Sequence, residues 1–359
     1  MKKINISLFI TIVVISLLGL LMIYSSSYVW AEYKFNDPFK YVKNQSLFLI
    51  VGILLMYLIS KVDFKNYYKY ANKIFLIGFI LLILVLIFGT ERNGSKSWFG
   101  IGSFGIQPSE FMKLVMIIFT SKYLYNNQKN IRDIRKGIIP ILFLTFIIFA
   151  LIMLQPDFGT GLILVMGVIG LLFIGGVDVK FFLKIGIFGM AGIAGLIMAA
   201  PYRLKRILSF LNPWQDPLGS GFQIIQSLYA IGPGGIFGFG LGNSRQKHFY
   251  LPEPQTDFIF SIISEEFGFI GILIVSTLFI VIITLSIKIA LNCENLFGKY
   301  LAFGIAFELG FQALLNLMVV VGLVPVTGVT LPFLSYGGSS LLITLLSMGI
   351  ILNISRYQK

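Results

Sequence analysis

Asp257 is the residue whose type and position most directly suggest chemistry. It lies in YLPEPQTDFIFSIISEE, residues 250–266, directly ahead of one of the most apolar runs of the chain. Asp257, Ser261 and Ser264 recur at i, i+4 and i+7, so on a helix they share one polar face. In a partly desolvated cleft such a carboxylate can accept a proton from a sugar hydroxyl as a general base. Two other interpretations are open: a helix cap, with Thr256 as the alternative capping residue, or a ligand for a cation or substrate without chemistry.

Basic side chains bracket the segment that leads to this acid. Arg203 and Arg206 open the segment 201–256, and Arg245 and Lys247 come near its end. Such a cluster suits a pyrophosphate, because arginine and lysine donate charge-assisted hydrogen bonds to phosphate oxygens. Alternatively, these cations only bind anionic lipid headgroups at a membrane surface.

Two further acids are candidates for substrate binding. Glu110 and Lys113 are three residues apart and therefore share one face of a helix. Either their ion pair lowers the cost of bringing a lysine into a membrane, or it faces an outward cavity and orders it. Asp157, in the short turn LQPDFGT, is the other candidate, and a turn cap is its alternative role.

A polar stripe lies inside another apolar run. Glu308, Gln312 and Asn316 are spaced at i, i+4 and i+8. Hydrogen bonding between helices explains such a stripe, and a path for protons or substrate is the alternative. By contrast, the single histidine, His248, indicates no metal cluster and is expected to be an ordinary loop residue. The sequence leaves the metal question open, with a divalent cation (Mg²⁺ or Mn²⁺) as the only cofactor considered.

The composition shows what kind of scaffold must position these residues. The chain has 359 residues, of which 57% are hydrophobic and only 12% are charged, far from the composition of a soluble domain. Its apolar runs lack the ten-residue alternation of a membrane β-barrel, so helices are expected to span the membrane. The ten runs are at about 6–24, 45–59, 74–88, 111–125, 138–154, 160–176, 181–200, 267–287, 301–323 and 336–354.

The distribution of positive charge predicts the topology. The net charge of +13 is not interpreted as nucleic-acid binding, because the basic residues cluster at alternate connections between the apolar runs. The positive-inside rule then favours ten transmembrane helices with both termini in the cytoplasm. We expect an all-α polytopic membrane protein, with residues 1–359 forming one integral-membrane domain.

Two connections depart from the short loops of a simple bundle. Residues 201–256 form a long segment between helices seven and eight, predicted to be extracytoplasmic, and 221–231 within it suggests a short amphipathic helix. Residues 324–340 are apolar but interrupted by Pro325, Gly328 and Pro332. Non-helical backbone at membrane depth persists only where protein buries it or where it lines a wet cavity, so this segment indicates an outward-facing cavity. A plain connection between helices nine and ten is the alternative.

Several long motifs resemble one known family, the SEDS proteins (shape, elongation, division, sporulation). The motifs are NGSKSWFGIGSFGIQPSEFMKL, LQPDFGT, TLPFLSYGGSS and the stretch YRLKRILSFLNPWQDPLGSGFQIIQSLYAIGPGGIFGFGLGNSRQKHFYLPEPQTDFIFSIISEEFG. The resemblance covers nearly the whole chain. NPWQDPLGSG and GLGNSRQKHFYLPEP are more similar to the FtsW/SpoVE branch, which serves division and sporulation, than to RodA.

The resemblance implies a ten-helix glycosyltransferase that polymerises lipid II into glycan strands on the outer face of the bacterial cytoplasmic membrane. It also implies a class B penicillin-binding protein transpeptidase and divisome-type membrane proteins as partners. Asp257 in TDFIF matches the family's essential aspartate, and Glu110 with Lys113 matches its paired acid and base. Some relatives carry an acid directly before YLPE, where this chain has Phe249, so no role for an acid there carries over.

Together these observations predict a lipid II polymerase in which Asp257 acts as the general base of an inverting transfer. Two functions of other classes are the alternatives. A lipid II flippase would use the Glu308 stripe as a translocation path, although the polar irregularities gather on the predicted outer side and no pair of matching broken helices is evident. A non-catalytic scaffold for the penicillin-binding protein would not depend on Asp257.

Overall fold

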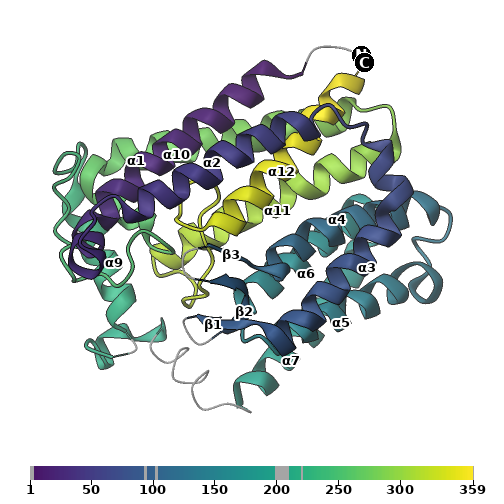
Figure 1. Ribbon diagram of the computed structural model, residues 1–359. Coiled ribbons are helices and arrows are strands. Elements are labelled where there is room, and N and C mark those ends of the chain that lie inside the picture. Colours follow the sequence, from purple (N-terminus) through teal and green to yellow (C-terminus); the bar gives the residue numbers. More distant parts are fainter. Residues whose placement is uncertain (1–3, 93–94, 102–103, 199–209, 220, 359) are drawn as a thin grey trace.

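The protein has an all-helical fold with one small sheet. The computed structural model describes residues 4–92, 95–101, 104–198, 210–219 and 221–358 (Figure 1). Eleven α-helices lie within these ranges. They are α1 (Ile6–Phe35), α2 (Lys40–Ile59), α3 (Lys65–Phe88), α4 (Pro108–Asn126), α5 (Ile139–Met153), α6 (Phe158–Ile174), α7 (Val179–Met198), α9 (Phe222–Ile231), α10 (Ile259–Asn292), α11 (Leu296–Val320) and α12 (Gly338–Ile354).

The long helices form two groups that meet at α11. In Figure 1, α1, α2, α10 and α12 run side by side, while α3 to α7 form the second group. The helix α11 packs against α10 in the first group and against α4 and α6 in the second. The helix α11 therefore lies in the interior of the bundle.

Helix length and outward-facing apolar residues identify a multi-pass membrane protein. Within the described residues, seven helices are long and apolar enough to cross a bilayer: α1, α2, α3, α10, α11, α5 together with the turn before it, and α12 together with the turn after it. The helix α6 is equally apolar but shorter. Large apolar side chains such as Ile50, Phe143 and Phe146 are exposed on the sides of the bundle, where lipid replaces water as the solvent.

A three-stranded antiparallel sheet precedes α4, and the sequence had not suggested it. Its strands are β1 (Thr90–Arg92), β2 (Ser95–Ile101) and β3 (Phe104–Ile106), in the order β1-β2-β3. Glu91 and Lys96 are paired across β1 and β2, and opposite charges in such positions stabilise a sheet. The strands are too short for a period-2 pattern to stand out beside long helices, which explains why they were missed.

The helix α10 begins ahead of its most apolar part. It starts at Ile259, two residues after Asp257, whereas the apolar run begins near residue 267. Gly268 interrupts it with φ of 60°, a conformation that favours glycine. A Cβ at Gly268 would lie 2.5 Å from the backbone nitrogen of Gly238, so the loop packs directly on this interruption.

The two ends of the bundle are different. The start of α1 lies beside the end of α12, where the backbone N–H of Asn5 donates to Ser355 Oγ over 3.0 Å. The helix α9 and the segments around it lie at the opposite end (Figure 1). Asp257 immediately precedes α10 at this second end, among the irregular segments that the sequence had marked.

Candidate functional site

The centre of the candidate site is a non-helical segment between α11 and α12. Residues 324–337 contain no regular element, yet many of their side chains are buried, among them Leu331 at 1% exposure and Leu334 at 0%. A Cβ at Gly19 of α1 would lie 2.3 Å from the main-chain oxygen of Phe333. Protein therefore surrounds this backbone, as expected for a segment that folds back into the bundle.

Asn316 and Gln312 of the polar stripe hold this segment in place. Asn316 Nδ2 donates to the main-chain oxygen of Val329 over 2.7 Å, and Gln312 Nε2 donates to that of Thr330 over 3.0 Å. Because a carbonyl left unpaired in a buried position is costly, these amides account for how an irregular backbone is tolerated here. Of the two explanations for the stripe, hydrogen bonding applies to these two members.

The same contacts extend to Asp257. Asn316 Nδ2 also donates to the main-chain oxygen of Asp257 over 2.8 Å. Ser335 Oγ donates to the main-chain oxygen of Thr256 over 2.7 Å, and the N–H of Tyr336 donates to that of Gln255 over 2.8 Å. The backbone on which Asp257 stands is therefore fixed by the segment between α11 and α12.

Within the part of the chain that the structure describes, the carboxylate of Asp257 has no hydrogen bond or ion pair. The residue is partly exposed. Phe258 occupies the N-cap position of α10, without a capping side chain, so Asp257 does not cap this helix. Gly328, with φ of 73°, lies next to the carboxylate, since a Cβ there would be 3.8 Å from Oδ2.

The surroundings of Asp257 favour its protonated form. Desolvation by burial is the main cause, and the negative charges of Glu253 and Asp157 add to it. Together they raise the pKa of Asp257 from 3.8 to about 6. A carboxylate with such a pKa is ionised at neutral pH and is a stronger base than an ordinary aspartate.

Asp157 has the capping role that its turn suggested. Its Oδ1 accepts from the N–H of Thr160 at the start of α6 over 3.2 Å. Its Oδ2 accepts from Gln107 Nε2 over 2.7 Å and from Ser109 Oγ over 3.3 Å. Burial is the first cause that raises the pKa of Asp157. Asp157 thus joins α6 to the start of α4, and its charge acts on Asp257.

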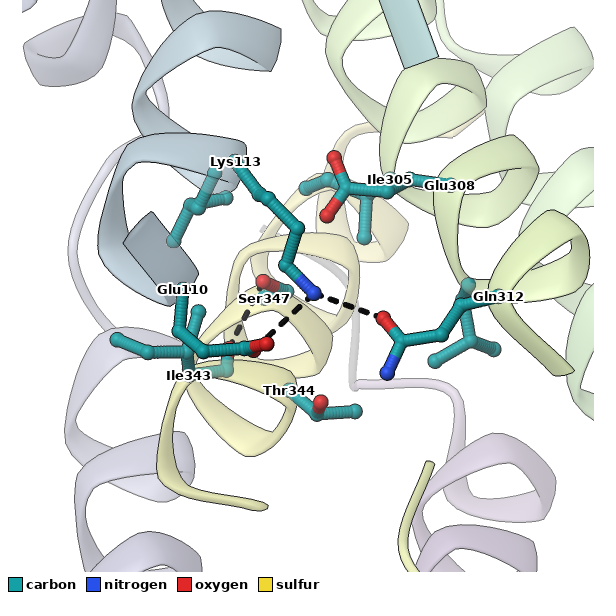
Figure 2. Close-up of a pocket in the computed structure, with 10 residues that line it drawn as sticks. Glu110, Lys113, Ile305, Glu308, Gln312, Ile343, Thr344 and Ser347 are labelled. Atoms are coloured by element: carbon teal, nitrogen blue, oxygen red, sulfur yellow. Dashed lines mark hydrogen bonds and ion pairs between the residues drawn. The ribbon is translucent and has the colours of Figure 1, made fainter. Parts of the chain in front are cut away.

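Glu110 and Lys113 form a buried ion pair inside the bundle (Figure 2). Lys113 Nζ lies 3.1 Å from Glu110 Oε2 and donates to Gln312 Oε1 over 2.8 Å. Glu308 faces them across a cavity of about 20 Å³, which is room for about one water molecule. Glu308 Oε2 is buried without a hydrogen-bond partner among the described residues. The pair neutralises a lysine in the bundle and lines this small cavity, and its role at an outward-facing cavity stays a prediction.

Lys247 does not lie where a headgroup-binding cation must lie. Its side chain is fully buried, and Nζ lies 2.9 Å from Glu266 Oε1. Ser25 Oγ of α1 donates to Glu266 as well, over 2.6 Å. The apolar surroundings require a cation to be paired, so Lys247 joins the loop to α1 and α10 and has no part in substrate binding.

Glu265 completes this connection between the loop and α10. It accepts hydrogen bonds from Ser244 Oγ over 2.5 Å and from the N–H of Arg245 over 2.8 Å. Two adjacent acids at the head of an apolar helix are costly alone. They persist because the residues 244–247 surround them with donors.

The remaining candidate cations are Arg245, Arg203 and Arg206. Arg245 is exposed, and its guanidinium carbon lies 5.0 Å from the ring centre of Phe239. Arg203 and Arg206 lie outside the described residues. In the described part of the chain, no group of three or more His, Cys, Asp or Glu side chains is placed to hold a metal ion. The divalent cation stays a prediction.

Reasoning from the sequence missed several residues of this site. Asn316 was identified only as part of a stripe, because its distance from Asp257 in the chain hid the contact between them. Glu265 and Glu266 were given no role, and the signal that could have explained them is Lys247, 19 residues earlier than Glu266. Gly328 was recognised only as a helix breaker.

Comparisons with known proteins agree with this fold. The family model described as "Cell cycle protein", FtsW/RodA/SpoVE, matches residues 5–359. Stage V sporulation protein E of Bacillus subtilis (strain 168) is 52% identical over 362 residues, covering 100% of this chain and 99% of the relative. A protein of Geobacter sp. (strain M18) named "Probable peptidoglycan glycosyltransferase FtsW" is 42% identical, covering 96% and 94%.

Solved structures show the same arrangement of helices. A chain from "Structural coordination of polymerization and crosslinking by a peptidoglycan synthase complex" matches with a TM-score of 0.81 and 32% identity, covering 100% of both chains. The rod shape determining protein RodA of Thermus thermophilus matches with a TM-score of 0.73 and 29% identity, covering 99% of this chain and 98% of RodA. The chain belongs to the FtsW/RodA/SpoVE family of cell cycle proteins.

Proposed function

We propose that this protein is a peptidoglycan glycosyltransferase that polymerises lipid II into glycan strands for septal, spore or other cell-wall synthesis. The observation that carries the proposal is the carboxylate of Asp257, which has no hydrogen bond or ion pair with any residue that the structure describes and stands on a backbone that Asn316 fixes. The similarity to relatives named peptidoglycan glycosyltransferase FtsW supports the reaction class. The similarity to Stage V sporulation protein E makes a sporulation role one of the cell-wall processes to be tested.

The proposed reaction takes place on the outer face of the cytoplasmic membrane. The seven candidate spans, with α4, α6 and α7, would make ten transmembrane helices. The start of α1 and the end of α12 lie together, which agrees with two cytoplasmic termini. Asp257 and α9 then face outward, on the side where residues 201–256 form the large loop.

In the proposed mechanism Asp257 removes the proton from the 4-hydroxyl of the acceptor sugar. The hydroxyl oxygen forms a bond to the anomeric carbon of the donor as the bond from that carbon to the pyrophosphate oxygen breaks. The bonding electron pair leaves with the lipid pyrophosphate, and the proton stays on Asp257. Attack opposite the leaving group inverts the anomeric centre through a transition state with oxocarbenium character.

The departing pyrophosphate requires positive charge close to it. Arg203, Arg206 and Arg245 are the proposed donors, and Mg²⁺ or Mn²⁺ is a further proposed source of charge. Interactions with developing charge are usually the largest contribution to catalysis. The buried Glu110–Lys113 pair and Asp157 are proposed to order the floor and rim of the substrate site, because Lys113 reaches the segment beside Asp257 through Gln312.

The proposed partner is a class B penicillin-binding protein that crosslinks the new strands. The similarity to a chain of a peptidoglycan synthase complex that coordinates polymerisation and crosslinking supports this partner. Other divisome-type membrane proteins are proposed to join it.

Purified protein incubated with lipid II, with and without its cognate transpeptidase, tests the function. Long glycan chains, resolved by gel electrophoresis and digested by lysozyme, are the expected product. Transfer of headgroups across vesicles without any polymer would support a flippase instead. An Asp257 variant that keeps both activity and assembly would support a non-catalytic scaffold.

A further inference from the structure

A short stretch of the loop, residues 235–240, is hydrogen-bonded into the interruption of α10 at Gly268. Four backbone hydrogen bonds join the two, and each uses a group of α10 that an unbroken helix would bond to its own neighbouring turn. They are Phe239 N–H to Glu265 O (3.0 Å), Gly240 N–H to Glu266 O (2.9 Å), Phe269 N–H to Gly235 O (2.9 Å) and Ile270 N–H to Ile236 O (3.1 Å). The loop therefore has a fixed height along α10.

This stretch belongs to a segment without any polar side chain. Residues 232–242 read GPGGIFGFGLG. The four large side chains of the segment are all exposed and form what we call the apolar loop patch. They are Ile236 (63% exposed), Phe237 (75%), Phe239 (36%) and Leu241 (48%). The backbone between them contacts α10 directly, because a Cβ at Gly238 would lie 2.3 Å from the main-chain oxygen of Glu266. An exposed patch of this kind marks an interaction surface.

The length of α10 gives the depth of the patch in the membrane. Residues 267–287 carry no charge, and Lys288 ends this stretch. At about 1.5 Å per residue the stretch is ~30 Å long, close to the thickness of the hydrocarbon core. Gly268 lies at one end of it, so the bonds at Gly268 place the patch at the boundary between hydrocarbon and headgroups. The exposed side chains of Phe269 and Leu273 continue the apolar surface into the span.

Three features of the patch fit lipid better than a protein partner. The N–H groups of Gly238, Phe239 and Gly240 are all bonded inside the chain, as backbone without access to water requires. The patch offers no hydrogen-bonding side chain, whereas protein interfaces carry about one hydrogen bond per 100–200 Å². Arg245 marks its polar edge, since its guanidinium carbon lies 5.0 Å from the ring centre of Phe239. An exposed cation beside an apolar surface is typical of the headgroup level.

We propose that the apolar loop patch is a membrane anchor, inserted among the lipid acyl chains of the leaflet at this end of the bundle. The anchor holds the loop at a fixed height relative to the bilayer, and residues 242–256 continue from it to Asp257. The inference goes beyond the proposed reaction and does not depend on it, because insertion requires no substrate and no turnover.

Spin labels on the full chain in lipid nanodiscs test the anchor. Each label is attached to one introduced cysteine in a Cys293→Ser background, and its relaxation is measured with two agents. Oxygen concentrates in hydrocarbon, whereas a nickel chelate stays in water. The label at F237C is expected to be relaxed more by oxygen than by the nickel chelate. L241C gives a second position in the patch if F237C fails to fold.

Two exposed leucines are the matched controls. Leu218 is 89% exposed and lies in the same loop beside Asp216, so the label at L218C is expected to be relaxed more by the nickel chelate. Leu273 is 55% exposed within the uncharged stretch of α10, so the label at L273C should show the hydrocarbon pattern.

The outcomes separate lipid from the other possible surroundings. Labels at 237 and 241 that behave like the label at 273 support the anchor. Labels that behave like the one at 218, or that neither agent reaches, overturn it. Loss of access for both agents when the transpeptidase is added would assign the patch to that partner and overturn the lipid assignment. A chain that shows the hydrocarbon pattern but makes no polymer contradicts the proposed function and not the anchor.

Discussion

Asn316 Nδ2 donates to two main-chain oxygens at once, that of Asp257 over 2.8 Å and that of Val329 over 2.7 Å. The first oxygen belongs to the segment that enters α10, and the second belongs to the segment that leaves α11. One amide therefore sets the position of the proposed base relative to Gly328 and its neighbours. This arrangement makes Asn316 a positioning residue rather than a catalytic one.

Replacing Asn316 with leucine should lower both stability and rate. Two buried carbonyl groups lose their donor, at a cost of about 1–3 kcal/mol each. A displacement of Asp257 by about 1 Å would reduce polymerisation on the order of 100-fold. Thermal unfolding in detergent and initial rates with lipid II measure the two effects.

The control for this variant is Ser46→Ala, which removes a hydrogen bond within α2 to the oxygen of Val42. It is expected to leave the rate unchanged. An N316L protein that polymerises lipid II like the wild type would show that Asn316 does not position the base.

The rate should depend on pH through the ionisation of Asp257. Only the ionised carboxylate can accept a proton, and its pKa is raised to about 6 by burial, by Glu253 and by Asp157. The rate is therefore expected to rise as the pH increases from 5 to 7. An acid limb centred near pH 4, as for an unperturbed aspartate, would contradict the structural account.

Glu253→Gln removes one of the charges that raise the pKa of Asp257. The acid limb of the rate profile should then move to lower pH, because the ionised form is less disfavoured. Glu294→Gln, after the far end of α10, is the matched control and should not move the profile. Equal shifts in both variants would point to a change in net charge rather than to the site.

The same ionisation affects stability, with a sign that can be worked out. Because the folded-state pKa of Asp257 lies above the unfolded value of 3.8, its contribution to stability is fully present below about pH 4 and is lost as the pH rises through about 6. D257N stays neutral and should avoid this loss. We expect its unfolding temperature to exceed that of the wild type at pH 7.5 but not at pH 4, and the reverse order would contradict the raised pKa.

Removing one partner of the buried Lys247–Glu266 pair should destabilise the protein more than removing both. Lys247→Met leaves the carboxylate of Glu266 buried without its cation, which typically costs about 3–5 kcal/mol. The double variant Lys247→Met with Glu266→Gln should recover much of this loss. A double-mutant cycle measures the coupling energy from the unfolding free energies of the wild type, the two single variants and the double variant. Additive effects would show that the pair is not buried as described.

The ion pair of Lys43 and Asp37 offers a comparison. Their side chains are 65% and 31% accessible, so Lys43→Met should change the unfolding temperature little. A loss as large as that of Lys247→Met would mean that charge, and not burial, governs both results.

The sequence predicted much of the scaffold because the membrane restricts what a chain can do. Long apolar runs can only be helices there, and most of the ten expected runs coincide with helices of the structure. Pro325, Gly328 and Pro332 likewise marked the non-helical segment, because they are incompatible with a regular helix at these positions. The number of spans and their orientation remain part of the proposal.

The details of the site depend on contacts that no local pattern encodes. Lys247 had the chemistry of a phosphate ligand, and only the folding of its loop onto α10 shows that it is paired with Glu266, which also accepts from Ser25. Glu265 and Glu266 are helical residues of α10, and the loop compensates their charges.

The most direct test of the account is the rate at which D257N polymerises lipid II with its transpeptidase present. The asparagine side chain has the same size as aspartate and leaves the backbone hydrogen bonds in place, but it cannot act as a base. The account predicts a loss of about 10²- to 10⁴-fold in rate, with folding and partner binding intact. Polymerisation by folded D257N at the wild-type rate would contradict the assignment of Asp257 as the general base.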